Sequence, residues 1–135
     1  MNLRENWGLT KFCSNSIWAI MYYSDLSEID VERLAMLLAE SDPSLQLVDV
    51  RERNEVAIAK IEGFAVYPLS EFEQWSDRIL TELEPEAETV VMCHHGMRSA
   101  QLCQWLSTRG FSNVHNLRGG IDAYSRLVDS TINRY

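Results

Sequence analysis

Apolar residues follow two patterns along the chain: short continuous runs, and longer segments in which they recur every three or four positions. Because a buried strand needs only a short apolar run, the first pattern predicts strands at 45–50, 64–67, 89–92 and 113–117. The second pattern predicts helices that begin near residues 31, 71, 99 and 121. Strands alternate with helices throughout, so the sequence predicts an α/β fold, with a small parallel sheet of about five strands and helices on both faces.

Capping residues mark two of the predicted helix starts. Asp30 is expected to be the N-cap of a helix that continues through Glu40. Ser70 and Glu73 have the S-x-x-E spacing of a capping box. Residues 56–60, by contrast, predict only one weak turn. The buried helix faces are expected at Val31, Leu34, Leu37 and Leu38, and at Phe72, Trp75, Ile79 and Leu83.

The stretch from Thr89 to Ala100 combines a predicted buried strand, a polar turn and the start of a helix. Cys93 follows the strand directly, which places it at the carboxyl edge of the sheet, where open α/β sheets bind ligands. A loop that turns from a strand into a helix directs several backbone N–H groups at one point, and the positive end of the helix strengthens the field there. Arg98 adds a full positive charge. These surroundings favour the thiolate of Cys93, which is the nucleophilic form of cysteine.

Cys93-His94-His95-Gly96-Met97-Arg98 resembles the C-x-x-G-x-R active-site loop of single-domain rhodaneses, sulfurtransferases that carry sulfur as a cysteine persulfide. Two further segments are similar to the same family. Residues 49–63 contain D-V-R-x-x-x-E and then I-x-G, and residues 110–120 contain G-F-x-N-V and L-x-G-G. The three motifs occur in the family's order between residues 45 and 124. Lys60 and Tyr124 stand where the family usually has histidine and tryptophan, and both departures concern structural positions.

The resemblance implies a rhodanese-like domain at residues 25–135 that transfers sulfane sulfur without a metal or organic cofactor. Cys93 would take sulfur from a small anionic donor, such as thiosulfate or a persulfide, and would pass it to cyanide or to a thiol, including a protein thiol. Arg98 would neutralise the donor's charge, and Gly96 would supply a backbone conformation that a Cβ would hinder. The persulfide would lie in a loop formed by His94, His95, Gly96, Met97 and Ser99.

Three charged residues near the second motif are expected to support the loop rather than to react. Asp49 and Arg51 end one predicted strand, and the ends of parallel strands meet at the same edge of a sheet. Asp49 is therefore placed where it can orient the active loop. Together with Glu55, these residues are interpreted mainly as a set of salt bridges and caps.

The two loop histidines have more than one interpretation. Rings that point outward from variable loop positions are favoured over a role in setting a pH dependence between about 6 and 7. A metal site formed by Cys93, His94 and His95 is disfavoured, because adjacent residues rarely converge on one ion. Cys103 is expected to be buried and inert, and Cys13 is a weak candidate for a resolving thiol.

Composition limits the remaining functions. The net charge of −8 and the absence of any run among the 12 basic residues argue against nucleic-acid binding. The apolar residues 17–23 are too few to span a membrane, which needs about 20. Three cysteines without a C-x-x-C pair indicate a reducing cytoplasm rather than a disulfide or zinc framework. The 135 residues suit one domain, expected as a monomer, with residues 1–24 as a poorly ordered N-terminal extension.

Two other functions remain open at this point. Cysteine phosphatases and arsenate reductases also place a cysteine below an anion-binding loop, but phosphatases resemble C-x5-R, and the sixth residue after Cys93 is Ser99. The alternative from a different class is a sulfur-relay or regulatory binding module with poor turnover of small molecules. The intact Cys93, Gly96 and Arg98 argue against an inactive domain but do not separate a free enzyme from a carrier.

Overall fold

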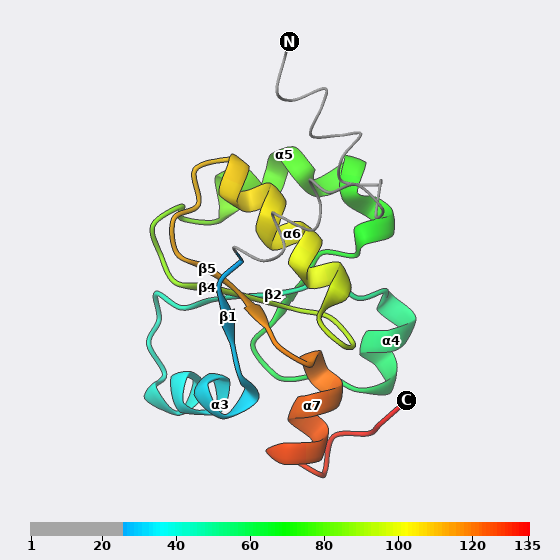
Figure 1. Cartoon of the computed structure of the whole chain (residues 1–135). Coiled ribbons are helices and arrows are strands. Elements are labelled where there is room, and N and C mark those ends of the chain that lie inside the picture. The colour runs from blue at the N-terminus through cyan, green and yellow to red at the C-terminus, as the bar shows by residue number, and fades with distance from the viewer. Residues whose placement is uncertain (1–25) are drawn as a thin grey trace.

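The computed structural model describes residues 26–135, so the predicted extension at residues 1–24, with Cys13, lies outside the described residues. Five parallel strands form one sheet in the order β1-β5-β4-β2-β3 (Figure 1). They are β1 (Glu28–Ile29), β2 (Gln46–Asp49), β3 (Ala65–Val66), β4 (Thr89–Met92) and β5 (Val114–Leu117). The predicted α/β fold with a five-stranded parallel sheet is confirmed.

Helices cover both faces of the sheet, as the sequence predicts (Figure 1). Helices α5 (Phe72–Glu82) and α6 (Met97–Thr108) lie on one face, and α3 (Val31–Glu40) and α7 (Gly120–Leu127) lie on the other. Alternate residues of β4 serve the two layers, because successive side chains of a strand point to opposite faces. Val91, and Cys93 two residues later, pack with α5 and α6. Val90 and Met92 pack with α3 and α7. Cys93 therefore begins its loop from the α6 side of the sheet.

Several element boundaries match the sequence pattern. β4 spans the predicted residues 89–92, and Asp30 caps α3 by accepting a hydrogen bond from the Arg33 amide at 2.7 Å. Helix α6 begins at Met97, two residues before the predicted start. The pattern does not predict strand β1, because its two residues, Glu28 and Ile29, include a charged side chain and contain no apolar run. Among residues 26–135, no helix has the length and apolar character needed to cross a bilayer.

The predicted capping box at Ser70 is wrong. Residues Leu69–Glu71 form a 3-10 turn, η1, and α5 begins after it without a side-chain cap. The Ser70 hydroxyl donates to Glu52 instead. Glu52 precedes α4 (Arg53–Ile58), a helix in the region where the sequence predicts only a weak turn. The Glu55 carboxylate accepts from the Glu52 amide at 2.9 Å and so stabilises the start of this helix.

A buried ion pair ends β2. The side chains of Asp49 and Arg51 are 1% and 0% exposed, and Arg51 Nη2 lies 2.8 Å from Asp49 Oδ2. Arg51 also donates to the carbonyl oxygens of Ala59 and Glu55, at 2.8 and 3.3 Å. Burial acts to lower the pKa of Arg51, but the hydrogen bonds and charge of Asp49, together with a bond to Tyr135, raise it above its ordinary value. The salt bridge expected between Asp49 and Arg51 is therefore present.

Replacing Asp49 by alanine is expected to lower the free energy of unfolding by about 3–5 kcal/mol, because the buried Arg51 charge would lose its counter-ion. Urea unfolding at neutral pH measures this change. Glu71→Ala is the control, since it breaks the exposed Arg53–Glu71 pair and should cost less than about 1 kcal/mol. Equal losses in the two variants would contradict the role of the buried pair.

Candidate active site

Cys93 lies at the carboxyl end of the central strand, between the ends of β5 and β2. The register pairs Asp49 of β2 with Met92, so the buried ion pair starts beside the residue that precedes Cys93. After β2 the chain continues outward to β3 and then returns through α5 to β4 on the other side of β2. Such a change of direction is where open α/β sheets form their ligand sites.

The sulfur of Cys93 faces the start of α6, as the sequence predicts. Cys93 Sγ accepts a hydrogen bond from the Gly96 amide at 3.0 Å, and Ser99 Oγ lies 3.3 Å from it. The first amides of a helix have no partner within the helix, and α6 has no side-chain cap at its start. The amides of Met97, Arg98 and Ser99 therefore add to the positive field at the sulfur.

Gly96 and Asn116 fix the shape of the loop. Gly96 has a φ of 107°, in the left-handed region that side chains with a Cβ rarely adopt. Its carbonyl oxygen accepts from Asn116 Nδ2 at 2.9 Å, and Asn116 Oδ1 accepts from the Ser99 hydroxyl at 2.5 Å. Asn116 is 3% exposed and belongs to β5. Sequence reasoning missed this residue, although a polar side chain inside a predicted buried strand was the available signal.

The start of α7 supports the other side of the loop. The amides of Ile121 and Asp122 donate to the carbonyl oxygens of Cys93 and His94, at 3.0 and 3.1 Å. Gly120 makes this approach possible, because a Cβ on Gly120 would come closer than 3.0 Å to both carbonyl oxygens. The sequence predicts only a tight turn here, so the contact between this helix and the loop is new information from the structure.

Arg98 is held by Glu55 of α4. Its two terminal nitrogens donate to the two Glu55 oxygens at 2.7 and 2.9 Å, and the Arg98 side chain is 33% exposed. The hydrogen bonds from Arg98, with smaller contributions from the Glu52 amide and from Tyr135, lower the pKa of Glu55 to about 2. Arg98 therefore brings its positive charge to the loop as one member of an ion pair with Glu55. The expected salt bridges extend from Glu55 to the active loop itself.

A family model described as the rhodanese-like domain matches residues 30–127. The chain belongs to the rhodanese-like domain family. Among solved structures, the crystal structure of a rhodanese-like domain protein from Staphylococcus aureus matches with a TM-score of 0.66 and 25% identity. The match covers 82% of this chain and 99% of that one.

Two curated relatives show how this rhodanese-like domain compares with longer and shorter proteins. It is 40% identical, over 93% of its length, to rhodanese-like/PpiC domain-containing protein 12, chloroplastic, from Arabidopsis thaliana. The match covers only 43% of that protein, so the chain spans less than half of the relative's length. A sulfurtransferase from Allochromatium vinosum is 35% identical over 75% of this chain and 90% of its own.

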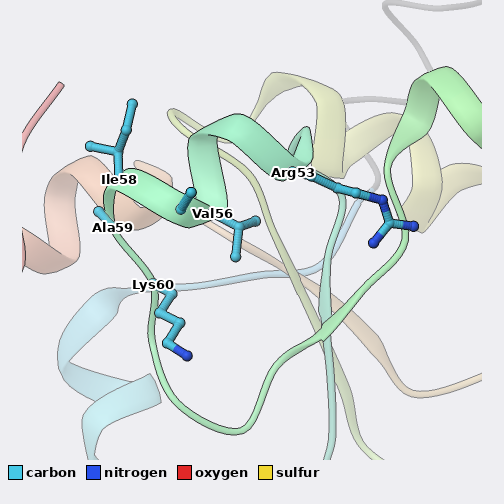
Figure 2. Close-up of a pocket in the computed structure, with 6 residues that line it drawn as sticks. Arg53, Val56, Ile58, Ala59 and Lys60 are labelled. Atoms are coloured by element: carbon cyan, nitrogen blue, oxygen red, sulfur yellow. The ribbon is translucent and has the colours of Figure 1, made fainter.

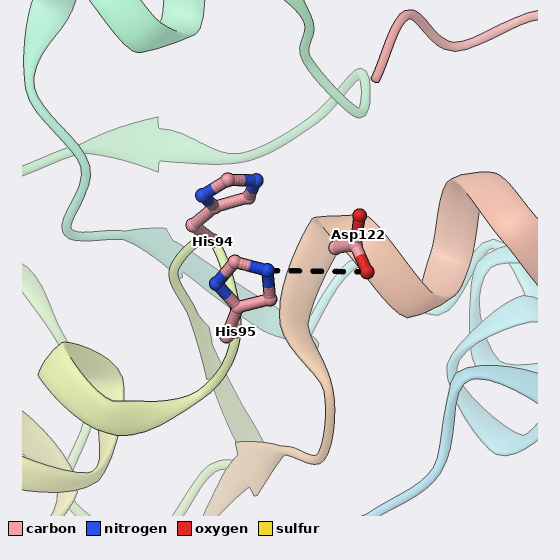
Figure 3. Close-up of side chains that lie close together, drawn as sticks. All are labelled: His94, His95 and Asp122. Carbon is pink, nitrogen blue, oxygen red and sulfur yellow. Dashed lines mark ion pairs between the residues drawn. The ribbon is translucent and has the colours of Figure 1, made fainter. Parts of the chain in front are cut away.

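The two histidines of the rhodanese-like loop differ in their surroundings. The His95 side chain is 62% exposed, and its Nε2 lies 3.9 Å from Asp122 Oδ2 (Figure 3). The His94 ring lies between two others, with its centroid 3.9 Å from the rings of both His95 and Tyr135. Burial and the neighbouring His95 lower the pKa of His94. The expected outward position is thus confirmed for His95 and wrong for His94.

His94, His95 and Asp122 offer potential metal-ligand atoms that lie within 4.8 Å of one another (Figure 3). The carboxylate is already used, because Asp122 accepts from Arg126 at 3.1 Å and from Arg134 at 3.3 Å. Two guanidinium groups on the same carboxylate oppose the approach of another cation. We therefore assign no metal to this cluster.

The other loop and helix residues have clear positions. Met97 is 75% exposed, so its side chain points into solvent and its amide alone serves the site. Cys103 of α6 is fully buried, and burial raises the pKa of its thiol. A thiol that keeps its proton is a poor nucleophile, which agrees with the expectation that Cys103 is inert. An open depression of about 530 Å³ lies along α4 and the two residues after it. It is lined by Arg53, Val56, Ala57, Ile58, Ala59 and Lys60 (Figure 2). No residue of the active loop lines it.

The Gly120→Ala substitution is expected to separate α7 from the active loop and to lower the free energy of unfolding by about 3 kcal/mol. The left-handed backbone, with a φ of 60°, contributes about 1–2 kcal/mol, and the collision with the two loop carbonyls adds the rest. Thermal or urea unfolding measures the loss. Gly110→Ala is the matched control, because Gly110 also has a positive φ but nothing lies within 4 Å of its Cβ position. Similar losses in both variants would contradict the importance of this contact.

The Glu55–Arg98 pair is expected to make stability depend on acid pH. Because the pKa of Glu55 is lowered from 4.5 to about 2 in the folded protein, its contribution is present above about pH 5 and is lost as the pH falls towards 2. The full contribution is about 3 kcal/mol at most. Urea unfolding of Glu55→Gln between pH 2 and 7 should show a smaller decline than the parent protein. Glu62→Gln, at an exposed pair, should retain the parent's decline.

Proposed function

We propose that this protein is a sulfurtransferase that carries sulfane sulfur as a persulfide on Cys93, with thiosulfate or a persulfide as donor. The observation that carries the proposal is the position of Cys93 Sγ, which accepts the Gly96 amide hydrogen bond at the start of α6. Oriented amides in a site closed to water stabilise anionic sulfur without reorganisation during the reaction. Membership of the rhodanese-like family and the similarity to a sulfurtransferase support this chemistry.

The reaction consists of two displacements at sulfur. The Cys93 thiolate attacks the outer sulfur of thiosulfate and forms a sulfur–sulfur bond, while the donor's own sulfur–sulfur bond breaks and its electron pair leaves with sulfite. Cyanide, or the thiolate of an acceptor, then attacks the outer sulfur of the Cys93 persulfide. The new bond forms thiocyanate or an acceptor persulfide, and the electron pair of the broken bond returns to Cys93. No oxidant or reductant is consumed.

Arg98 supplies the fixed positive charge for an anionic donor. Its side chain is partly exposed beside the loop, and Glu55 orients its guanidinium through two hydrogen bonds. A planar guanidinium in a fixed position binds a sulfonate with two parallel hydrogen bonds. Because Cys93 is only 1% exposed, the outer sulfur of a donor approaches it past the exposed residues of the loop, His95 and Met97.

The proposal includes a reducing compartment such as the cytoplasm. Cys93 and Cys103 are free thiols among residues 26–135, and the reaction needs Cys93 as a thiolate at the start of each cycle. The Arabidopsis relative is named as a chloroplastic protein, and this name describes the location of the relative alone. The acceptor is proposed only as a class, a small nucleophile or a protein thiol.

Intact mass spectrometry after treatment with thiosulfate tests the proposed function. The parent protein is expected to gain the mass of one sulfur atom, and cyanide should remove it with release of thiocyanate. Cys93→Ser should gain nothing, whereas Cys103→Ser should behave as the parent protein. Sulfur on Cys103, or turnover of an aryl phosphate without any sulfur transfer, would contradict the proposal. A persulfide that passes only to a particular protein thiol would identify a sulfur carrier.

A further inference from the structure

Tyr135 joins the two charged pairs next to the active loop. Its hydroxyl accepts a hydrogen bond from Arg51 Nη1 at 2.9 Å and lies 3.2 Å from Glu55 Oε1, to which it donates. Burial raises the pKa of Tyr135, so the hydroxyl keeps its proton at neutral pH and remains a donor to the carboxylate. The same Glu55 oxygen accepts from Arg98. One phenol thus connects the buried Asp49–Arg51 pair to the arginine of the active site.

The ring of Tyr135 contacts the active loop directly. It stacks on the ring of His94, with centroids 3.9 Å apart and planes inclined by only 7°. His94 is the residue after Cys93, and its carbonyl oxygen is fixed by the Asp122 amide. With His95 on its other side, the His94 ring has little freedom to move. Its Nε2 is buried and has no hydrogen-bond partner among residues 26–135.

Two neighbouring residues hold Tyr135 in place. Arg134 pairs with Asp122 of α7 at 3.3 Å, and Asn133 Nδ2 donates to the Ile58 carbonyl oxygen at the end of α4 at 3.1 Å. Residues 133–135 therefore bridge α4 and α7, the two helices that contact the active loop. These contacts, one to each helix, fix the position of Tyr135.

We propose that Tyr135 is a positioning residue of the sulfur-transfer site, which orients Arg98 through Glu55 with its hydroxyl and immobilises His94 with its ring. This role rests on the proposed function of Cys93. The Tyr135 hydroxyl, together with Arg98, donates hydrogen bonds to the Glu55 carboxylate. It thereby determines where Glu55 holds the Arg98 guanidinium for an anionic sulfur donor. The ring keeps the first residue after the nucleophile in one orientation. The two contacts reach the loop through different residues, Arg98 and His94, and substitution separates them.

Kinetics and histidine titration of two variants test this role. Tyr135→Phe keeps the stacked ring and removes the hydroxyl, so the KM for thiosulfate is expected to rise about fivefold while kcat changes less than about twofold. Tyr135→Ala removes both contacts, so the same rise in KM is accompanied by an upward shift of the pKa of His94 as the ring becomes exposed. NMR follows that titration, with His94→Gln to assign the signal. The groups facing His94 are His95, Asp122, Glu55 and Tyr135, and the first three are unchanged in both variants.

Tyr67→Phe is the matched control, because it removes a phenol bonded to a carboxylate, Glu82, outside the active loop. It should leave the KM and the titration of His94 unchanged. If the Tyr135 variants lower the melting temperature but leave either the KM for thiosulfate or the His94 titration of Tyr135→Ala unchanged, the positioning role is wrong. That result leaves sulfur transfer by the parent protein intact. A parent protein that takes no sulfur from thiosulfate contradicts the proposed function itself and, with it, this role.

Discussion

The site depends on the hydrogen bond between the Gly96 amide and the sulfur of Cys93. This bond needs a loop that turns back within three residues, which the left-handed backbone of Gly96 provides. The loop is then fixed from two sides, by Asn116 of β5 and by the first amides of α7. Because these partners lie at the carboxyl edge of one parallel sheet, the fold itself aims the amides at the sulfur before any donor binds.

Charge around the site is arranged in neutral pairs. Asp49 neutralises Arg51, and Glu55 neutralises Arg98, in a protein whose net charge is −8. In the proposed reaction, an anionic donor would be attracted at short range by oriented amides and helix ends, and it would share Arg98 with Glu55 instead of finding an isolated cation. The pairing keeps the guanidinium in a defined orientation, which matters more for a reaction at one sulfur atom than the long-range field of the protein does.

The sequence predicted those parts of the structure that a local pattern encodes. β4, the Asp30 cap and the position of Cys93 before α6 each depend on neighbouring residues, and all three are confirmed. The capping box at Ser70 failed because Glu52, 18 positions earlier, competes for the same hydroxyl. The partners of the loop, Asn116 and Tyr135, are 17 or more positions from the groups they bind. Contacts of that kind arise from the tertiary fold and leave no periodic signal in the chain.

The Ser99 hydroxyl links the sulfur of Cys93 to Asn116. It donates towards Asn116 Oδ1 at 2.5 Å and towards Cys93 Sγ at 3.3 Å, and because a hydroxyl has one proton, the two acceptors share it. The shorter contact takes the larger share, so a full hydrogen bond to the sulfur needs the hydroxyl to turn away from Asn116. The Gly96 amide has no second acceptor to serve, and its N–H is directed at the sulfur alone. The backbone therefore provides the constant stabilisation of anionic sulfur, and Ser99 provides a part that it divides between the sulfur and Asn116.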